Sequence, residues 1–147
     1  MAGLIEGDGS IKVPESERSE KGKKIYPSIT IIFVDIDLPL AQIIAKILDA
    51  TINKASGNYY NLSVYKKSAL FLVASLLNGK FRTPKIEALH RLIIWLNNLK
   101  EFPILELLPV DESDIKTNHW LAGFSDSDAK ILISFTIKDS LAKNIKF

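Results

Sequence analysis

The sequence contains no cysteine, which excludes disulfide bonds and thiolate metal sites. It has no apolar run of about 18 residues or more and no signal peptide ahead of its first motif, so we expect a soluble, intracellular protein without a membrane partner. Arginine is scarce, because 16 of the 19 basic residues are lysine, and the formal net charge is only +2. With 147 residues the chain is long enough for one domain with a hydrophobic core and too short for two complete ones.

A short segment occurs twice in this sequence. Residues 1–9 are MAGLIEGDG and residues 121–129 are LAGFSDSDA. Each copy is a run of apolar and small residues that ends in a carboxylate, Asp8 in the first and Asp128 in the second. Small residues lie four positions apart in each copy, so they share one face if the segment is helical. Two such faces allow helices to pack almost backbone to backbone, which would make the two acids neighbours.

Two carboxylates at the same end of a helix pair repel each other unless a cation lies between them. Asp8 and Asp128 are therefore candidate metal ligands. Carboxylate oxygens suit Mg²⁺, which takes one or two protein ligands beside water and phosphate oxygens. For each acid, the alternative is a role in helix termination or as an ordinary surface charge.

The two segments resemble the signature motifs of the LAGLIDADG family of homing endonucleases and intron maturases. The first matches closely, while in the second Ala129 and Lys130 replace the usual Gly and Ser, which places a lysine beside the acid. The resemblance implies an α+β fold of αββαββα repeats, each with a saddle-shaped antiparallel sheet, and two motif helices packed together. It also implies a Mg²⁺-dependent DNA endonuclease in which Asp8 and Asp128 bind metal, while Glu6 and Asp126 serve structure.

Hydrophobic patterning after the first motif predicts the elements of one such repeat. Strands are predicted over 10–13 and 25–34, a helix over 38–48, strands over 51–55 and 59–65, and helices over 68–77 and 84–99. The helix over 38–48 is predicted to bury the apolar side chains that lie at helical spacing, namely Leu40, Ile43, Ile44 and Ile47. The chain then divides into a first repeat over 1–100, a linker over 101–117 and the start of a second repeat over 118–147, with a strand predicted over 131–138.

Alternate side chains of an antiparallel sheet can enter the major groove of DNA. The polar side chains predicted on the outward face are candidate nucleic-acid contacts: Ser10, Lys12, Ser28, Thr30, Thr51, Asn53, Tyr59, Asn61 and Ser63. Lys23 and Lys24, in the charged loop over 15–24, are further candidates. This face lacks Arg and Gln and carries Ile32 and Val34, so the alternative for each residue is an ordinary exposed strand position.

The turn over 79–85 is basic and again resembles the family. Lys80 and Arg82 match the place where the family puts a cation near the scissile phosphate, so they are candidate catalytic residues, with simple phosphate anchoring or solvation as the alternative. Lys85, predicted within the next helix, is the least favoured of the three basic residues. His90 and His119 are predicted to be structural, and His119 is expected to seat the second motif helix.

Two hypotheses of function follow. The first is a site-specific intron-homing endonuclease that cleaves double-stranded DNA. Because one repeat binds only half of a DNA recognition site, a longer chain or another polypeptide would supply a second sheet. The second is a non-catalytic protein: a maturase that binds intron RNA, or a component of an organellar ribosome in contact with ribosomal RNA and proteins. Abundant Ile, Lys and Asn fit an A+T-rich genome, so we expect a mitochondrial matrix or other organellar location.

Overall fold

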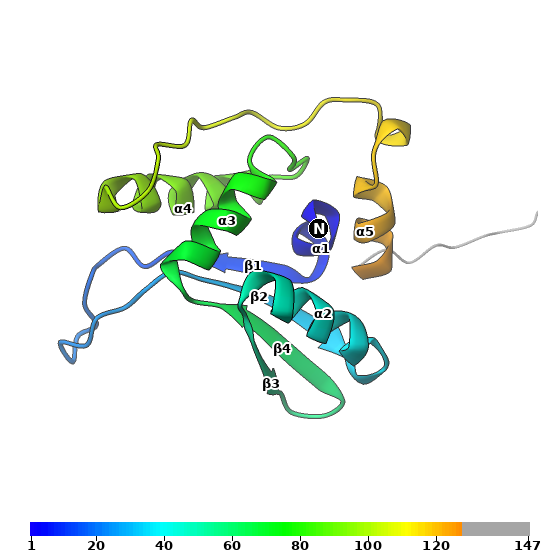
Figure 1. Cartoon of the computed structure of the whole chain (residues 1–147), viewed down its shortest axis with the longest axis horizontal. Coiled ribbons are helices and arrows are strands. Elements are labelled where there is room, and N and C mark those ends of the chain that lie inside the picture. Colours follow the sequence, from blue (N-terminus) through cyan, green and yellow to red (C-terminus); the bar gives the residue numbers. More distant parts are fainter. Residues whose placement is uncertain (128–147) are drawn as a thin grey trace, which may run out of the picture.

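The computed structural model describes residues 1–127 and has an α+β fold. The elements in chain order are α1 (Ala2–Asp8), β1 (Gly9–Lys12), β2 (Ser28–Val34), the 3₁₀ turn η1 (Asp35–Asp37), α2 (Leu38–Leu48), β3 (Thr51–Lys54), β4 (Tyr59–Val64), α3 (Lys67–Leu77), α4 (Ile86–Leu99), the 3₁₀ turn η2 (Ile115–Thr117) and α5 (Trp120–Ser127) (Figure 1). The predicted αββαββα order is confirmed, with α4 and α5 added after it. Within the described residues no helix is long and apolar enough to cross a membrane.

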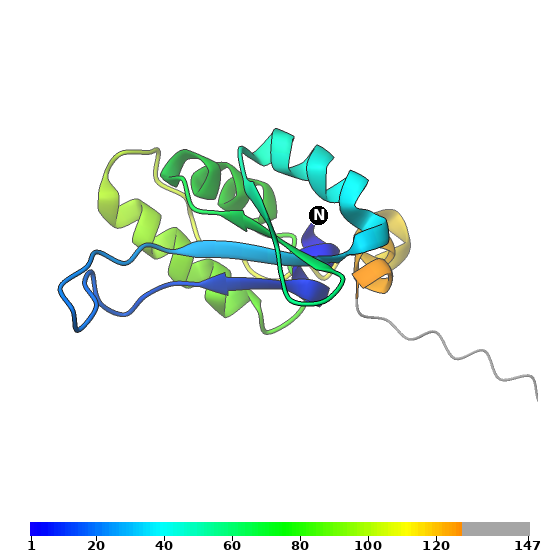
Figure 2. The ribbon, with the colours of Figure 1, turned by 90° about the horizontal axis from the view of Figure 1, so that it is seen from below.

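The four strands form one antiparallel sheet in the order β1-β2-β4-β3. β2 alternates as predicted, because Ile29, Ile31 and Phe33 are buried against the helices. Figure 2 shows the sheet from the side that the helices leave open, with α3 and α4 behind it. The sheet therefore has one face in the hydrophobic core and one face available to a ligand.

The core lies between the inner face of the sheet and helices α3 and α4. Helix α4 buries one apolar face: Leu89, Leu92, Ile93 and Leu96 are at most 1% exposed. Phe81, in the turn between α3 and α4, is fully buried as well. This turn is thereby fixed to the core, which matters because it carries the basic residues that the sequence singles out.

Helix α2 begins and ends as predicted but buries a different face. Its buried residues are Ala41, Ile44 and Leu48, and the predicted core residues Leu40, Ile43 and Ile47 are 40%, 59% and 63% exposed. The helix is apolar on most of its surface, so periodicity does not select one face. The small side chain of Ala41, fully buried here, lets the helix lie close to the core, and the larger side chains remain outside.

The segment predicted as a linker over 101–117 runs along α3 and α4 rather than standing apart from them (Figure 1). Asn97 exchanges two hydrogen bonds with the backbone of Leu105, and Asn78 bonds the backbone of Glu106 and Leu108. These side chains satisfy polar backbone groups that no regular element pairs. The linker therefore has a defined path from the end of α4 to the start of α5.

Candidate functional site

The two motif helices α1 and α5 lie side by side at backbone distance (Figure 1). A Cβ atom on Gly3 would lie 2.1 Å from the carbonyl oxygen of Trp120 and 2.6 Å from the amide nitrogen of Phe124. A Cβ atom on Gly123 would lie 3.1 Å from the amide nitrogen of Leu4. The predicted packing of the motif helices through small residues is confirmed.

Asp8 is the last residue of α1 and is exposed. It borders a hollow of about 330 Å³ to which α1, β2, α2, β4 and α5 all contribute, and whose lining is Leu4, Asp8, Ile32, Phe33, Val34, Asp37, Leu40, Tyr59, Asp126 and Ser127. Ser127 directly precedes Asp128, which lies outside the described residues together with Ala129, Lys130 and the strand predicted over 131–138. The structure thus brings Asp8 and the end of the second motif helix to one place.

The donor set at this hollow suits a hard divalent cation. Asp8 offers carboxylate oxygens, which Mg²⁺ prefers, and Asp37 and Asp126 add negative charge to the same hollow. Within residues 1–127 there is no group of three or more His, Asp or Glu side chains close enough to hold a metal ion together. Because Mg²⁺ keeps several waters and takes only one or two carboxylates, a single described ligand at Asp8 is compatible with such a site.

Lys85 binds the C-terminal end of α1, the helix that Asp8 ends. Its Nζ donates to the backbone oxygens of Ile5 at 3.1 Å, Glu6 at 2.7 Å, Gly7 at 3.4 Å and Gly9 at 2.8 Å. The carbonyls of Ile5, Glu6 and Gly7 lie at the C-terminal end of α1 and that of Gly9 directly follows it, where the helix dipole favours a positive charge. Lys85, which the sequence favoured least among the three basic residues, thus caps the end of the first motif helix.

Neither Lys80 nor Arg82 lines the hollow that Asp8 borders. Lys80 is exposed and, with Met1, Ala2 and Trp120, lines a separate hollow of about 560 Å³. The backbone of Arg82 and Thr83 in the turn between α3 and α4 donates to the Glu6 carboxylate, whereas Lys85 follows the turn and reaches the carbonyl groups at the end of α1.

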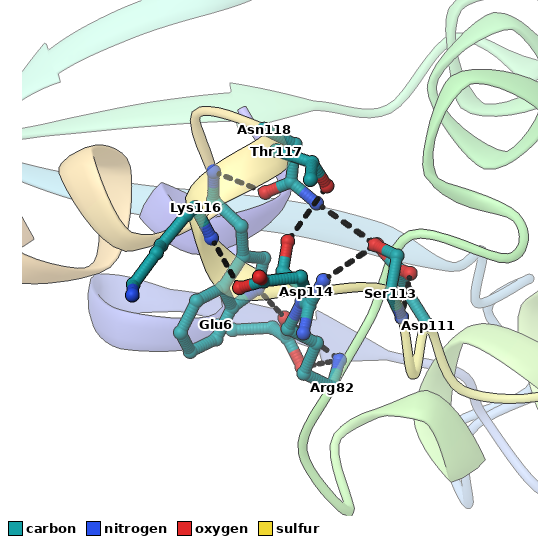
Figure 3. A network of polar contacts seen from close by, with 9 residues as sticks. Glu6, Arg82, Asp111, Ser113, Asp114, Lys116, Thr117 and Asn118 are labelled. Atoms are coloured by element: carbon teal, nitrogen blue, oxygen red, sulfur yellow. Dashed lines mark hydrogen bonds and ion pairs between the residues drawn. The ribbon is translucent and has the colours of Figure 1, made fainter.

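Glu6 joins three segments of the site (Figure 3). Its carboxylate is 5% exposed and accepts hydrogen bonds from the amide of Arg82 at 2.9 and 3.1 Å, from the amide of Thr83 at 2.7 Å and from the hydroxyl of Thr83 at 2.6 Å. The indole Nε1 of Trp120 donates to the same carboxylate. These donors satisfy the acceptor sites of a carboxylate that is shielded from water. Glu6 therefore connects α1 to the basic turn and to α5, as the resemblance implied.

The guanidinium of Arg82 is occupied by the linker and by α5. It lies 3.1 Å from the carboxylate of Asp111, donates to the hydroxyl of Ser113 at 2.8 Å and lies 5.8 Å from the ring centroid of Trp120. The side-chain and backbone hydrogen bonds of Ser113 hold the pKa of Asp111 below its usual value, with a further lowering by the charge of Arg82. Within the part of the chain that the structure describes, the Arg82 guanidinium links the linker to the start of α5.

Asn118 completes this network at the start of α5 (Figure 3). Its amide nitrogen lies 3.3 Å from the carboxylate of Asp111 and 3.2 Å from the hydroxyl of Ser113, and its amide oxygen accepts from the backbone amide of Trp120 at 2.9 Å. Sequence reasoning missed the roles of Asp111, Ser113 and Asn118, since a polar linker gives no periodic signal. The one available signal was their position just ahead of the second motif.

The polar residues predicted on the outward face of the sheet occupy that face. Exposed or half-buried side chains are found at Ser10, Lys12, Ser28, Thr30, Thr51, Asn53, Tyr59 and Asn61, and Lys23 and Lys24 are exposed in their loop. The predicted exposure of Ser63 is wrong, because this residue is only 4% exposed. Its Oγ lies 3.4 Å from Oγ1 of Thr30, and its carbonyl oxygen accepts from Thr51 at 3.3 Å, so its neighbours on both sides cover it.

The two histidines take up backbone contacts. Nε2 of His90 lies 2.9 Å from the carbonyl oxygen of Leu108, which ties α4 to the linker. The carbonyl oxygen of His119 accepts from the amide of Gly123 at 3.3 Å, at the first turn of α5. The His90 contact agrees with the structural role predicted for it, whereas the His119 contact is a backbone bond that does not test the role of its side chain.

Comparison with known proteins identifies relatives of this chain. The family model described as LAGLIDADG endonuclease matches residues 1–96. The intron-encoded DNA endonuclease aI3 of Saccharomyces cerevisiae is 34% identical over 147 aligned residues, which cover 91% of this chain and 35% of that protein. An uncharacterised 37.2 kDa protein of cox1 intron 2 in Schizosaccharomyces pombe is 30% identical, with coverage of 95% and 40%. The chain therefore spans well under half the length of these relatives.

Solved structures with a similar fold are homing endonucleases. The crystal structure of I-TnaI aligns with a TM-score of 0.57 at 16% identity, over 87% of this chain and 85% of that chain. The meganuclease I-SmaMI, bound to uncleavable DNA, aligns with a TM-score of 0.63 at 15% identity, over 86% of this chain and 56% of that chain. These structures confirm the predicted fold.

Proposed function

Because the chain belongs to the LAGLIDADG endonuclease family, we propose that it acts as a site-specific DNA endonuclease of the intron-homing type. The observation that carries this proposal is the contact of α1 with α5 at backbone distance. This contact sets Asp8 and Ser127, the residue before Asp128, on one hollow. Phosphodiester hydrolysis needs oxygen ligands for a divalent cation at the place where the scissile phosphate binds, and the hollow offers them.

Asp8 and Asp128 are the proposed metal ligands, and Mg²⁺ is the proposed metal. Held by these acids, a divalent cation would supply activation of the attacking water and charge stabilisation for the leaving 3′ oxygen. Lys85 is the proposed positioning residue, since its Nζ holds the carbonyls of Gly7 and Gly9 on both sides of Asp8. A fixed end of α1 keeps the Asp8 carboxylate oriented toward the hollow. Lys80 and Arg82 remain outside this proposal.

The open face of the sheet is the proposed surface for double-stranded DNA. Its outward side chains lie at every second position, as a sheet in the major groove requires. One sheet covers half of a site, so we propose that a second sheet completes the enzyme, from the remainder of a longer chain or from a second polypeptide. The named relatives are an intron-encoded protein and a cox1 intron product, which supports an organellar origin and, for this chain, a mitochondrial matrix location.

Cleavage of duplex DNA that carries the joined exons of the host gene tests the proposal. The chain is incubated with this DNA and Mg²⁺, beside Asp8→Asn and a matched control, Asp37→Asn. Asp37 is an exposed carboxylate on the same hollow, so its substitution removes the same charge without removing the proposed ligand. We expect cleavage by the wild type and by Asp37→Asn, and loss of at least about 100-fold in rate for Asp8→Asn.

Two outcomes would contradict the proposal. Full cleavage by Asp8→Asn would show that Asp8 is not a required metal ligand. Absence of metal-dependent cleavage by the wild type, together with tight binding of the host intron RNA, would instead favour the non-catalytic maturase.

A further inference from the structure

The outward face of the sheet is arranged in cross-strand rows of different chemistry. In one row Ile32 of β2 lies opposite Asn61 of β4, which lies opposite Asn53 of β3. In the next row Val34 lies opposite Tyr59. Ile32 is 47% exposed and Val34 is 41% exposed, although both stand on the open face. Apolar side chains in this position are accessible to the apolar groups of a bound partner.

The remaining rows offer little hydrogen bonding to guanine. Arg and Lys are the side chains that read guanine in the major groove, and the only basic residue among these rows of the described sheet is Lys12, opposite Ser28 at one end of β2. In the central row the hydroxyls of Thr30 and Thr51 are already directed at Ser63. The face is therefore poorly equipped for G·C pairs over most of its area.

The chemistry of the first row fits A·T pairs. Thymine presents a methyl group in the major groove, which apolar side chains contact, and adenine presents N6 and N7, which an asparagine amide binds with two hydrogen bonds. Neighbouring strands lie about 4.8 Å apart, so the row of three spans about 10 Å. This length covers about three base-pair steps of about 3.4 Å each.

Resting on the proposed function, we propose that Ile32, Asn61 and Asn53 select A·T base pairs in the DNA half-site. Ile32 contacts a thymine methyl group, and Asn61 and Asn53 bind adenine. Val34 extends the apolar contact toward the hollow beside Asp8, because both Ile32 and Val34 line that hollow. The preference belongs to DNA, since uracil in RNA lacks the methyl group.

Selection from randomised duplexes tests this inference. The full chain is used to enrich duplexes from a random library, and the bound sequences are read. The enriched sequences are then prepared with deoxyuridine in place of thymidine, which removes only the methyl group. We expect a run of A·T pairs, and an affinity that falls about fourfold at the contacted thymine, as burial of one methyl group predicts.

Variants assign the preference to residues. Ile32→Ala should bind the thymine and uracil duplexes equally, whereas the matched control Ile36→Ala should keep the difference, because Ile36 is 84% exposed on η1 and lies outside the sheet. Asn61→Ala should lower the preference for adenine over other bases by about 5- to 150-fold. Thermal unfolding of each variant checks that the fold is retained.

The outcomes separate this inference from the proposed function. Enrichment of G·C pairs, or equal binding of thymine and uracil duplexes by the wild type, would overturn the inference while DNA binding stands. The inference would also be overturned if Ile32→Ala and Ile36→Ala lost the affinity difference between thymine and uracil duplexes to the same extent. Absence of duplex binding, or preferential binding of RNA, would overturn both.

Discussion

The replacement of Gly3 by alanine is expected to separate the two motif helices. The added Cβ would lie 2.1 Å from the carbonyl oxygen of Trp120, whereas an ordinary contact begins at 3.4 Å. The deficit is about 1.3 Å against backbone atoms, which cannot turn away as a side chain can. α5 must therefore move, and the hydrogen bond from the indole of Trp120 to the carboxylate of Glu6 is then broken.

The magnitude follows from these two effects. Overpacking costs about 1–3 kcal/mol, and a lost hydrogen bond to a charged group costs about 1.5–3 kcal/mol. We expect Gly3→Ala to lower the free energy of unfolding by about 2.5–6 kcal/mol, the sum of the two effects and a large share of the ordinary stability of a domain. For a chain of this size the midpoint of thermal unfolding should fall by about 8–18 °C.

Thermal unfolding followed by circular dichroism, with tryptophan emission as a probe of Trp120, measures the effect. Gly123→Ala is the graded comparison, because its Cβ would meet the amide of Leu4 at 3.1 Å and needs a shift of only a few tenths of an ångström. Ala122→Ser is the control on the exposed side of α5. An unchanged midpoint and unchanged emission in Gly3→Ala, or a larger effect in Gly123→Ala, would refute the backbone-distance packing.

Three further predictions concern the polar contacts of the site. Glu6→Gln should lower the free energy of unfolding in urea by about 1.5–3 kcal/mol, because the NH₂ group of glutamine would face the hydrogen-bond donors that the carboxylate now accepts from. An unchanged midpoint of unfolding would show that Glu6 does not hold α1, the basic turn and α5 together. Lys85→Met should lower the free energy of unfolding by about 1–2 kcal/mol in the same assay, because the carbonyl groups at the end of α1 lose a hydrogen-bond donor. Lys80→Met should change it by no more than about 0.5 kcal/mol. Equal effects of the two substitutions would contradict the capping of α1 by Lys85. Because the pKa of Asp111 is lowered in the folded chain, its contribution is complete above the unfolded value of about 3.9 and disappears as the pH falls through the lower folded value. Asp111→Asn should therefore flatten the decline of stability with acid, and a parallel decline in variant and wild type would show that Asp111 is not responsible.

Patterning and motif resemblance predict the secondary structure and the helix pair because both are local signals. Every second residue of β2 is buried and the residues between are half-buried or exposed, and the glycines of the two motifs mark the contact between helices. Helix α2 shows the limit of this approach, since Leu40 and Ile43 are as apolar as the buried Ile44. Which face is buried depended on the fit of Ala41 against the core, and the sequence pattern does not encode that fit.

The polar part of the site depends on contacts between residues far apart in the chain. Lys85 binds the backbone of residues 5 to 9, and its partners are carbonyl groups that every sequence has. Backbone partners leave no trace in residue types, so the basic residue at the end of α1 was not identifiable from sequence alone. Ser63 was misjudged for a related reason, because Thr30 and Thr51 cover it only in the folded register of the sheet.

The path of the linker over 101–117 has a consequence for assembly. It leads α5 back to α1 of the same chain, so this helix pairing is a unimolecular step with an effective concentration in the millimolar range. A chain cut within the linker would have to recover the pair by diffusion from two separate molecules. At concentrations far below millimolar, each α1 therefore keeps its own α5, and exchange of α5 between two copies becomes competitive only in very concentrated solutions.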